Sequence, residues 1–265
     1  MMTKIPNIQN LDRSTIQVSE LLIQSIKREL EGIDSLGVSF SGGFDSSFLV
    51  YLVQNYTAVK EISLLTICFP GTYDVQNSNH SARLLKLKPQ FYLLDQSILA
   101  DGISELSEVI GTLNPVVISY MLPLFFVCKN SKRDNILLGQ GADELFGGYH
   151  WQQELENEDF IEKTRKTVLD LLLEVEVREN KIAEYFGKKL LMPYLDKDLI
   201  EYVLPLPKRF RAGEVPKHLV RLAGEHLGLP IEICWKKKKA AQYGSGIMKE
   251  MKKGKEASGL EWRDS

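Results

Sequence analysis

The chain has 265 residues, of which 26% are charged, with a formal net charge of −2 and a pI of about 6.2. This balance gives no broad basic surface, so we expect no nucleic-acid partner. No apolar run reaches the roughly eighteen residues of a membrane span, no secretory leader is evident, and the three cysteines form no CxxC pair. We therefore expect a cytoplasmic protein without a membrane anchor, zinc site or disulfide framework.

Predicted helices and strands alternate along the chain. An apolar stripe of helical period predicts a helix over Ser14–Leu30. Short apolar runs predict buried strands at Leu36–Phe40, Glu61–Phe69, Gln90–Leu94 and Asn135–Leu138. Further helices are predicted from about Asp45 and over Ser78–Leu87, Ser97–Ile110, Tyr120–Asn130 and Ile161–Ala183. This order predicts an α/β protein with a doubly wound parallel sheet and a helical C-terminal half. Such sheets bind ligands beyond the carboxyl ends of their strands.

A glycine-rich turn, Ser41–Ser46, follows the first predicted strand. Its two glycines let the backbone turn sharply, and the helix after it directs free N–H groups at the same place, which predicts a phosphate site. The turn lacks the Lys-Ser/Thr of a Walker A loop and the third glycine of a dinucleotide fingerprint. Because Asp45 would repel phosphate, we expect it to hold Mg²⁺. The alternative is that Asp45 only caps its helix, with no ligand.

A second loop, Gly139–Tyr149, follows the fourth predicted strand. Its four glycines disfavour a regular helix and permit close backbone approach, and Asp143 and Glu144 lie among them. Asp143 facing Asp45 would complete a Mg²⁺ shell, which commonly combines one or two carboxylates with phosphate oxygens. Glu144 is expected either to join that shell or to brace the loop. A surface loop with solvated acids is the alternative.

These two loops resemble motifs of known enzymes. Ser41–Ser46 matches the SGGxDS loop of the N-type ATP pyrophosphatases, whose fold is of the adenine nucleotide alpha hydrolase type. The second loop resembles the G-x-G-x-DE-x-FGGY motif of the synthetase domain of asparagine synthetases. Weaker similarity continues through Arg178–Lys181, Met192–Asp196, Lys217–Arg221 and Trp235–Lys239, so the resemblance covers roughly residues 14–251. It implies a nucleotide-binding core in 1–150 and a mainly helical part in 151–265 that completes an acceptor site.

The resemblance implies an amide-forming ligase. ATP would adenylate a carboxylate, aspartate being one candidate, with release of pyrophosphate, and ammonia would then displace AMP. The pyrophosphate is assigned to Ser41, Gly42, Gly43, Asp45 and Ser46, and the adenine to backbone near Ser39, Ile67 and Gly139, with Gln140 beside it. Lys217 and Arg221 are assigned to the phosphates, Asp45 and Asp143 to Mg²⁺ and to catalysis, and Lys238 to the transition state.

Departures from the family pattern leave the acceptor open. Gln140 stands where asparagine synthetases mostly have an acid, and Lys189–Leu191 replaces an E-x-R sequence that we expect to shape the acceptor rim. A second acceptor, as in β-lactam synthetase-like ring closure, and a non-catalytic nucleotide-binding subunit are the alternatives. The second residue is Met2, not the cysteine of a glutaminase. We therefore expect ammonia from solution or from a separate glutaminase subunit. The sequence leaves open whether the chain forms a homodimer.

Overall fold

A parallel sheet of five strands forms the centre of the protein. The computed structural model describes residues 8–213, 215–236 and 244–258. The strand order is β3-β2-β1-β4-β5, with bounds β1 (Ser35–Ser39), β2 (Glu61–Cys68), β3 (Pro89–Leu93), β4 (Asn135–Leu137) and β5 (Lys189–Leu191). The first four strands confirm the predicted ones to within one residue at each end. β5 has no predicted counterpart, because three residues are too few to show a period.

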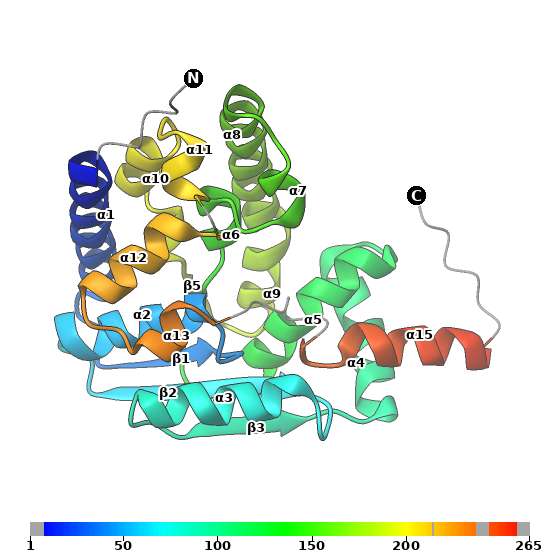
Figure 1. The fold of residues 1–265 in the computed structure, drawn as a ribbon. Coiled ribbons are helices and arrows are strands. Elements are labelled where there is room, and N and C mark those ends of the chain that lie inside the picture. Colours follow the sequence, from blue (N-terminus) through cyan, green and yellow to red (C-terminus); the bar gives the residue numbers. More distant parts are fainter. Residues whose placement is uncertain (1–7, 214, 237–243, 259–265) are drawn as a thin grey trace.

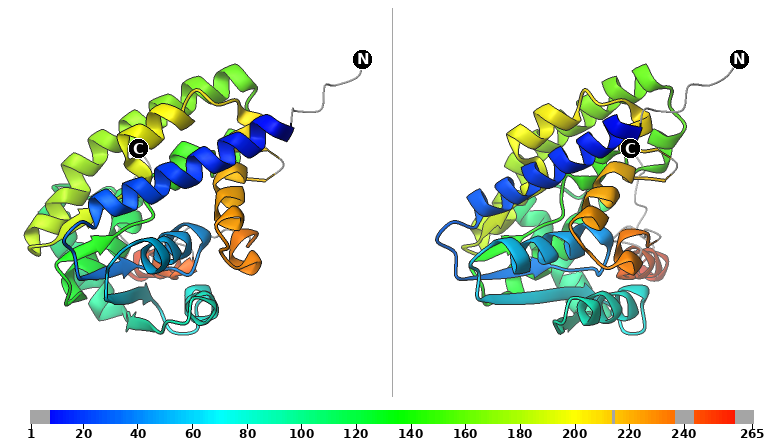
Figure 2. Two further views of the ribbon diagram at one scale, coloured as in Figure 1. Left: turned by 90° about the vertical axis from the view of Figure 1, so that its left-hand side faces the viewer. Right: turned by 60° about the vertical axis from the view of Figure 1, so that its left-hand side comes forward.

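Helices cover both faces of this sheet (Figures 1 and 2). Before β4 they are α1 (Ile8–Glu29), α2 (Phe44–Tyr56), α3 (Tyr73–Leu84), α4 (Gln96–Ile110) and α5 (Pro115–Asn130). Between β4 and β5 they are α6 (Ala142–Phe146), α7 (His150–Gln153), α8 (Asn157–Glu174), the π-helical turn η1 (Val175–Glu179) and α9 (Asn180–Tyr185). After β5 they are the 3₁₀ turn η2 (Pro193–Leu195), α10 (Lys197–Val203), α11 (Lys208–Arg211), α12 (His218–His226), α13 (Ile231–Cys234) and α15 (Ile247–Ser258). The predicted class, a doubly wound parallel α/β sheet with a helical C-terminal half, is confirmed.

One local expectation is wrong. The glycines of the second loop do not prevent a regular helix, since α6 forms inside it. Gly141 and Gly147 flank α6 with φ of 92° and 72°, and these left-handed conformations let the chain enter and leave one short helix between them.

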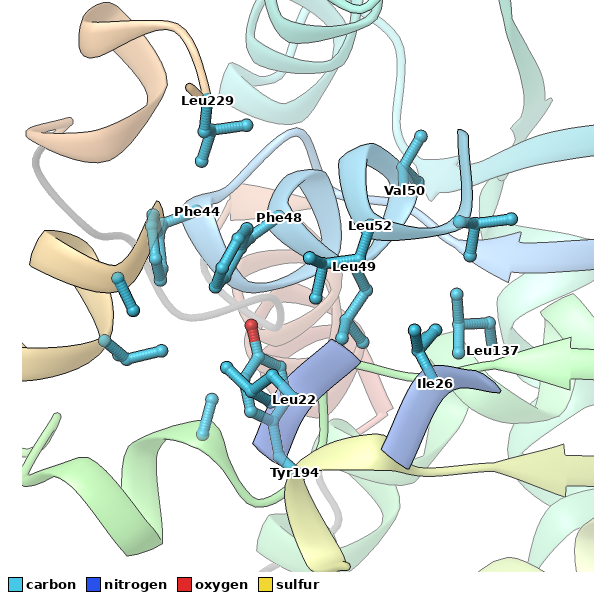
Figure 3. Packing of buried hydrophobic residues seen from close by; sticks show 14 of the residues in the cluster. Leu22, Ile26, Phe44, Phe48, Leu49, Val50, Leu52, Leu137, Tyr194 and Leu229 are labelled. Atoms are coloured by element: carbon cyan, nitrogen blue, oxygen red, sulfur yellow. The ribbon is translucent and has the colours of Figure 1, made fainter. Parts of the chain in front are cut away.

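Side chains of alternating residues in the strands point into two separate cores. Leu64 and Leu137 belong to the core beneath α1, α2 and α12, while their neighbours Leu65 and Ile136 belong to the core beneath α4, α5 and α15. Figure 3 shows the first core, where Leu22 and Ile26 of α1 meet the apolar side of α2. In the views of Figure 2, α1 lies alongside α10 and α12 and ties the C-terminal helices to this face.

The topology places a crevice beside β1. From β1 the chain moves outward through β2 to β3, and then crosses to β4 on the other side of β1. The connections after β1 and β4 therefore leave the sheet toward opposite sides, and ligands bind at such a switch point. The two predicted loops follow these two strands.

Two further observations on the described ranges concern the cysteines and possible membrane spans. Cys68, Cys128 and Cys234 are buried free thiols. In these ranges no single helix combines the length and apolar character of a membrane span, although α4 and α5 meet that test jointly as a pair bent by 102°.

Candidate functional site

A cavity of about 530 Å³ opens at the switch point. Ser39 at the end of β1, Ile67 near the end of β2 and Gly139 just after β4 all line it, so the three predicted adenine contacts come together. Other predicted residues in its wall are Ser41, Gly43, Asp45, Ser46, Gln140, Asp143, Lys217 and Arg221. Gly42 belongs to the same turn but is not in the wall, and Lys238 lies outside the described residues.

Helix α3 fixes the orientation of the Ser41–Ser46 turn. The Asn77 amide donates to the carbonyl of Ser41 (2.7 Å), and the Ser81 hydroxyl donates to that of Gly42 (2.6 Å). Because C=O and N–H point in opposite directions in a trans peptide, these bonds turn the following N–H groups away from α3. Gly42 has φ of 69°, and a Cβ there would lie 2.5 Å from the Asn77 carbonyl oxygen, so the close approach requires glycine.

The N-terminus of α2 adds further donors to this turn. The N-cap is Gly43, which makes no side-chain capping bond, so the first N–H groups of the helix stay available to a ligand. Asp45 is therefore not the cap of its helix. The buried hydroxyls of Ser46 and Ser47 have no hydrogen-bonding partner within the described residues, and Ser46 lines the cavity. Donors gathered at the positive end of a helix suit an anion with several oxygens, such as a polyphosphate.

Lys217 joins the two loops. Its ammonium lies 2.7 Å from both carboxylate oxygens of Asp45 and 3.1 Å from Oδ1 of Asp143, and its side chain is 1% exposed. Burial lowers the pKa of Lys217, but Asp143 and Asp45 outweigh burial, so that pKa is raised. Lys217 also has φ of 62°, a left-handed conformation that is unusual for a lysine and that marks a constrained site. The predicted convergence of Asp45 and Asp143 is thus present, with a cation between them.

The residues around this pair fit a magnesium ion. Two carboxylates that reach one ammonium are close neighbours, and both line the cavity beside the phosphate-type turn. In the described part of the chain, no cluster of three or more His, Cys, Asp or Glu is arranged to hold a metal. Mg²⁺ takes one or two carboxylates and completes its shell with phosphate oxygens and water, and Asp45 and Asp143 are two such carboxylates.

Arg221 and Tyr194 hold the frame of the site. The Arg221 guanidinium donates to the carbonyls of Pro216 (2.9 Å), Cys234 and Lys236 (3.2 Å) and lies over the ring of Phe44 at 5.1 Å. It therefore orders the backbone on both sides of α12. The Tyr194 hydroxyl points toward α2 in Figure 3 and donates to the carbonyl of Asp45 (3.3 Å).

Comparison with known proteins decides the family. The asparagine synthase family model matches residues 17–190 and 162–258, which together cover most of the chain. The chain belongs to the asparagine synthase family.

Relatives in this family are larger proteins. The putative asparagine synthetase [glutamine-hydrolyzing] 1 of Methanocaldococcus jannaschii is 26% identical over 280 residues, covering 89% of this chain and 51% of that protein. Asparagine synthetase B [glutamine-hydrolyzing] of Escherichia coli is 26% identical over 251 residues, covering 87% and 45%. The chain thus spans about half the length of these relatives.

Among solved structures, the U34-tRNA thiolase NcsA of Methanococcus maripaludis matches with a TM-score of 0.39 and 14% identity. The match covers 94% of this chain and 82% of that chain, and it is too distant to bear on function.

Besides Asp45 and Asp143, the cavity wall contains the acidic residues Glu144, Glu174 and Glu179. The side-chain amide of Gln140 donates to Oε1 of Glu179 (3.5 Å). Glu144 accepts a hydrogen bond from the Tyr149 hydroxyl, so it braces the second loop. Burial, followed by the Glu174 charge, raises the pKa of Glu179 to about 7.

The structure places Lys189–Leu191 in a strand, β5, outside the cavity wall. Lys189 begins the strand, so it lies at the end of the sheet opposite the site, where its charge acts on Glu29. The effect of this departure from the family's E-x-R sequence on the acceptor stays a prediction.

Asn77 and Glu179 are among the cavity residues that the sequence-based set lacks. Asn77 orients the turn from α3, and nothing in its surroundings in the sequence distinguishes it from an ordinary helix residue. Glu179 belongs to the segment Arg178–Lys181, which carries a family resemblance, but the pattern alone does not show that this residue lines the cavity.

Proposed function

We propose that this chain is an ATP-dependent amide-forming ligase. It adenylates a small-molecule carboxylate, releases pyrophosphate, and passes the acyl group from AMP to ammonia. Family membership supports this reaction class, and the observation that carries it is the Lys217 bridge between Asp45 and Asp143 beside the donor-rich turn. In this proposal residues 1–150 supply the nucleotide site, and residues 151–265 complete the acceptor end.

The roles follow from the positions of the groups. The turn Ser41–Ser46 binds the pyrophosphate through its N–H groups and the Ser46 hydroxyl, while backbone at Ser39, Ile67 and Gly139 contacts the adenine. Asp45 and Asp143 would hold Mg²⁺, which when bound neutralises charge on the departing pyrophosphate. Lys217 keeps both carboxylates in position and adds positive charge near the phosphates. Preorganised donors of this kind are the main source of stabilisation for developing charge.

Two classes of carboxylate are candidates for the acceptor. Aspartate, giving asparagine, is the first candidate because the relatives that cover this chain are asparagine synthetases. Gln140 favours the second, another carboxylate or an internal amine, because it places a neutral amide, which cannot take a proton, in the cavity wall. For aspartate, and for any other acid without an internal amine, the nitrogen donor in the proposal is ammonia, supplied free or by a separate glutaminase.

Pyrophosphate release tests the proposal directly. The purified chain is incubated with ATP, Mg²⁺, ammonium chloride and one member of a panel of carboxylates, and AMP, pyrophosphate and amide are quantified. Carboxylate-dependent release in equal amounts of AMP, pyrophosphate and amide is expected, and the productive acid identifies the acceptor. Replacing ammonium with glutamine tests the nitrogen source. Tight ATP binding without release for every acid would instead indicate a nucleotide-binding subunit.

A further inference from the structure

The carboxyl of Glu179 is a buried group that the adenylation step does not use. Glu179 is 2% exposed, lines the cavity, and its Oε2 has no hydrogen-bonding partner within the described residues. Its Oε1 accepts from the amide of Gln140. A buried carboxyl whose second oxygen lacks a hydrogen bond costs free energy of folding. This points to a ligand that supplies the missing partner.

The backbone places this carboxyl by an irregular turn. Between α8 and α9 the chain forms the π-helical turn Val175–Glu179, and the N–H of Asn180 donates to the carbonyl of Val175, five residues earlier. One extra residue in a helix rotates all that follows by about 100°. Such turns are frequent at functional sites. Here the turn ends on Glu179 itself.

The charged and titratable groups around Glu179 come from four elements. Glu174 of α8 and Glu144 of α6 disfavour its ionised form, and Arg178 of η1 favours it. Arg178 is engaged elsewhere, with the Tyr120 hydroxyl of α5 at 2.7 Å and Glu174 at 3.2 Å. Glu179 therefore exchanges its proton near neutral pH, as a general base for this chemistry requires.

We propose that Glu179 is the group that accepts the proton of the nitrogen nucleophile. This inference rests on the proposed function. Ammonia attacks the acyl carbon of the adenylate, one N–H proton passes to Oε2 of Glu179, and the C–O bond to AMP breaks as the carbonyl re-forms. The products are the amide, AMP and protonated Glu179, so atoms and charge balance. The amide of Gln140 donates a hydrogen bond to Oε1 of Glu179, so Oε2 is the oxygen that takes the proton.

The test separates the two halves of the reaction. Carboxylate-dependent exchange of labelled pyrophosphate into ATP reports adenylation, and amide formation from ammonium reports the second step. In Glu179→Gln we expect exchange to stay within about threefold of the original chain and amide formation to fall about a hundredfold or more, the usual range for loss of a general base. Glu184→Gln is the matched control, because Glu184 is an exposed carboxylate on the next helical turn.

Two further readouts distinguish proton transfer from support of the fold. At a fixed concentration of free ammonia, amide formation by the original chain should rise with pH to an inflection near 7, and Glu179→Gln should lack it. The exchanged pair Gln140→Glu with Glu179→Gln should recover at least about tenfold of the lost rate, because the contact between these two cavity positions again contains a carboxyl. Should Glu179→Gln not fold, the pH profile of the original chain decides.

The outcomes are separable. Equal amide formation in Glu179→Gln and the original chain, equal losses in both half-reactions, or the absence of the inflection near pH 7 would overturn the role of Glu179 and leave the proposed function standing. No exchange with any carboxylate in the original chain would overturn the proposed function, and this inference with it.

Discussion

The ammonium of Lys217 lies 2.7 Å from both carboxylate oxygens of Asp45, although 172 residues separate them in the sequence. The same ammonium reaches Asp143 at 3.1 Å, so one side chain that is 1% exposed links α12 with both glycine-rich loops. Two carboxylates held this close repel each other without a cation. Lys217 therefore stabilises the fold, and in the proposed function it keeps Asp45 and Asp143 in position for Mg²⁺.

Replacing Lys217 tests this link. In Lys217→Met, Asp45 and Asp143 lose their buried cation, and we expect a loss of about 3–5 kcal/mol in the free energy of unfolding. Addition of Mg²⁺ should restore part of that loss, because the metal replaces the ammonium between the carboxylates. Urea unfolding with and without Mg²⁺ measures both effects. Lys60→Met is the control, since Lys60 is 75% exposed in a surface pair with Asp34. A Mg²⁺ effect equal in both variants would count against a metal at this place.

Asp45 should be required for the nucleotide as well as for the lysine. In Asp45→Asn we expect weaker binding of Mg·ATP and a loss of pyrophosphate release of at least about a hundredfold, because a neutral amide is a poor ligand for Mg²⁺. Isothermal titration with ATP, with and without Mg²⁺, separates metal-dependent from metal-independent affinity. Asp34→Asn, a surface carboxylate with 76% exposure, should behave as the original chain does. Unchanged release in Asp45→Asn would remove Asp45 from the metal shell.

The turn before α2 should tolerate no side chain at Gly42. A Cβ there meets the Asn77 carbonyl oxygen at 2.5 Å, and φ is 69°, so Gly42→Ala combines a clash with a strained backbone. Gly32 has nearly the same φ, 74°, but nothing within 4 Å of its Cβ position. Gly32→Ala should thus lose only the about 1–2 kcal/mol of the left-handed conformation, whereas Gly42→Ala should lose more and also bind ATP more weakly. Equal losses of stability with equal ATP binding would show that α3 does not constrain the turn.

Whether the sequence could predict a feature depends on how far apart in the sequence the interacting residues lie. The strands and the two glycine-rich loops are local patterns, and the parallel order brings the loops together by a general rule. The bridge from Lys217 to Asp45 depends on the path of α12 over α1 and α2, and no local pattern contains it. The position of Glu179 depends on one extra residue in a helical turn, which the apolar period of α8 does not reveal. β5 was missed because three residues show no period.

The catalytic role of Lys238 stays a prediction, and mutagenesis tests it. It follows Lys236, which lines the cavity and whose pKa burial lowers, while Lys238 itself lies outside the described residues. We expect Lys238→Ala to bind ATP nearly as well as the original chain and to lose about a hundredfold in turnover, roughly 3 kcal/mol at the barrier. Steady-state turnover and ATP titration give the two numbers. Lys239→Ala is the control, and a loss confined to that variant would show that the catalytic lysine is Lys239.

The stability of the protein should fall as pH rises through the range in which Glu179 ionises. The folded state raises the pKa of Glu179 from its ordinary value of 4.5 to about 7, mainly because burial disfavours the charged form. The folded state therefore binds this proton more tightly than the unfolded chain does. The favourable contribution is complete below about pH 4.5 and is lost as pH rises to about 7, which amounts to on the order of 3 kcal/mol.

Glu179→Gln should flatten this dependence, because glutamine fills the same space and does not ionise. Urea unfolding between pH 5 and pH 8 should show a smaller decrease in the free energy of unfolding for Glu179→Gln than for the original chain. Some decrease should remain, since the pKa of Glu29 is also raised to about 7, by burial first and by the Asp196 charge. Glu184→Gln, at an exposed position, should keep the full decrease. Parallel curves for Glu179→Gln and the original chain would mean that the carboxyl of Glu179 is already hydrated and ionised at pH 5, and such a group is not a base poised near neutral pH.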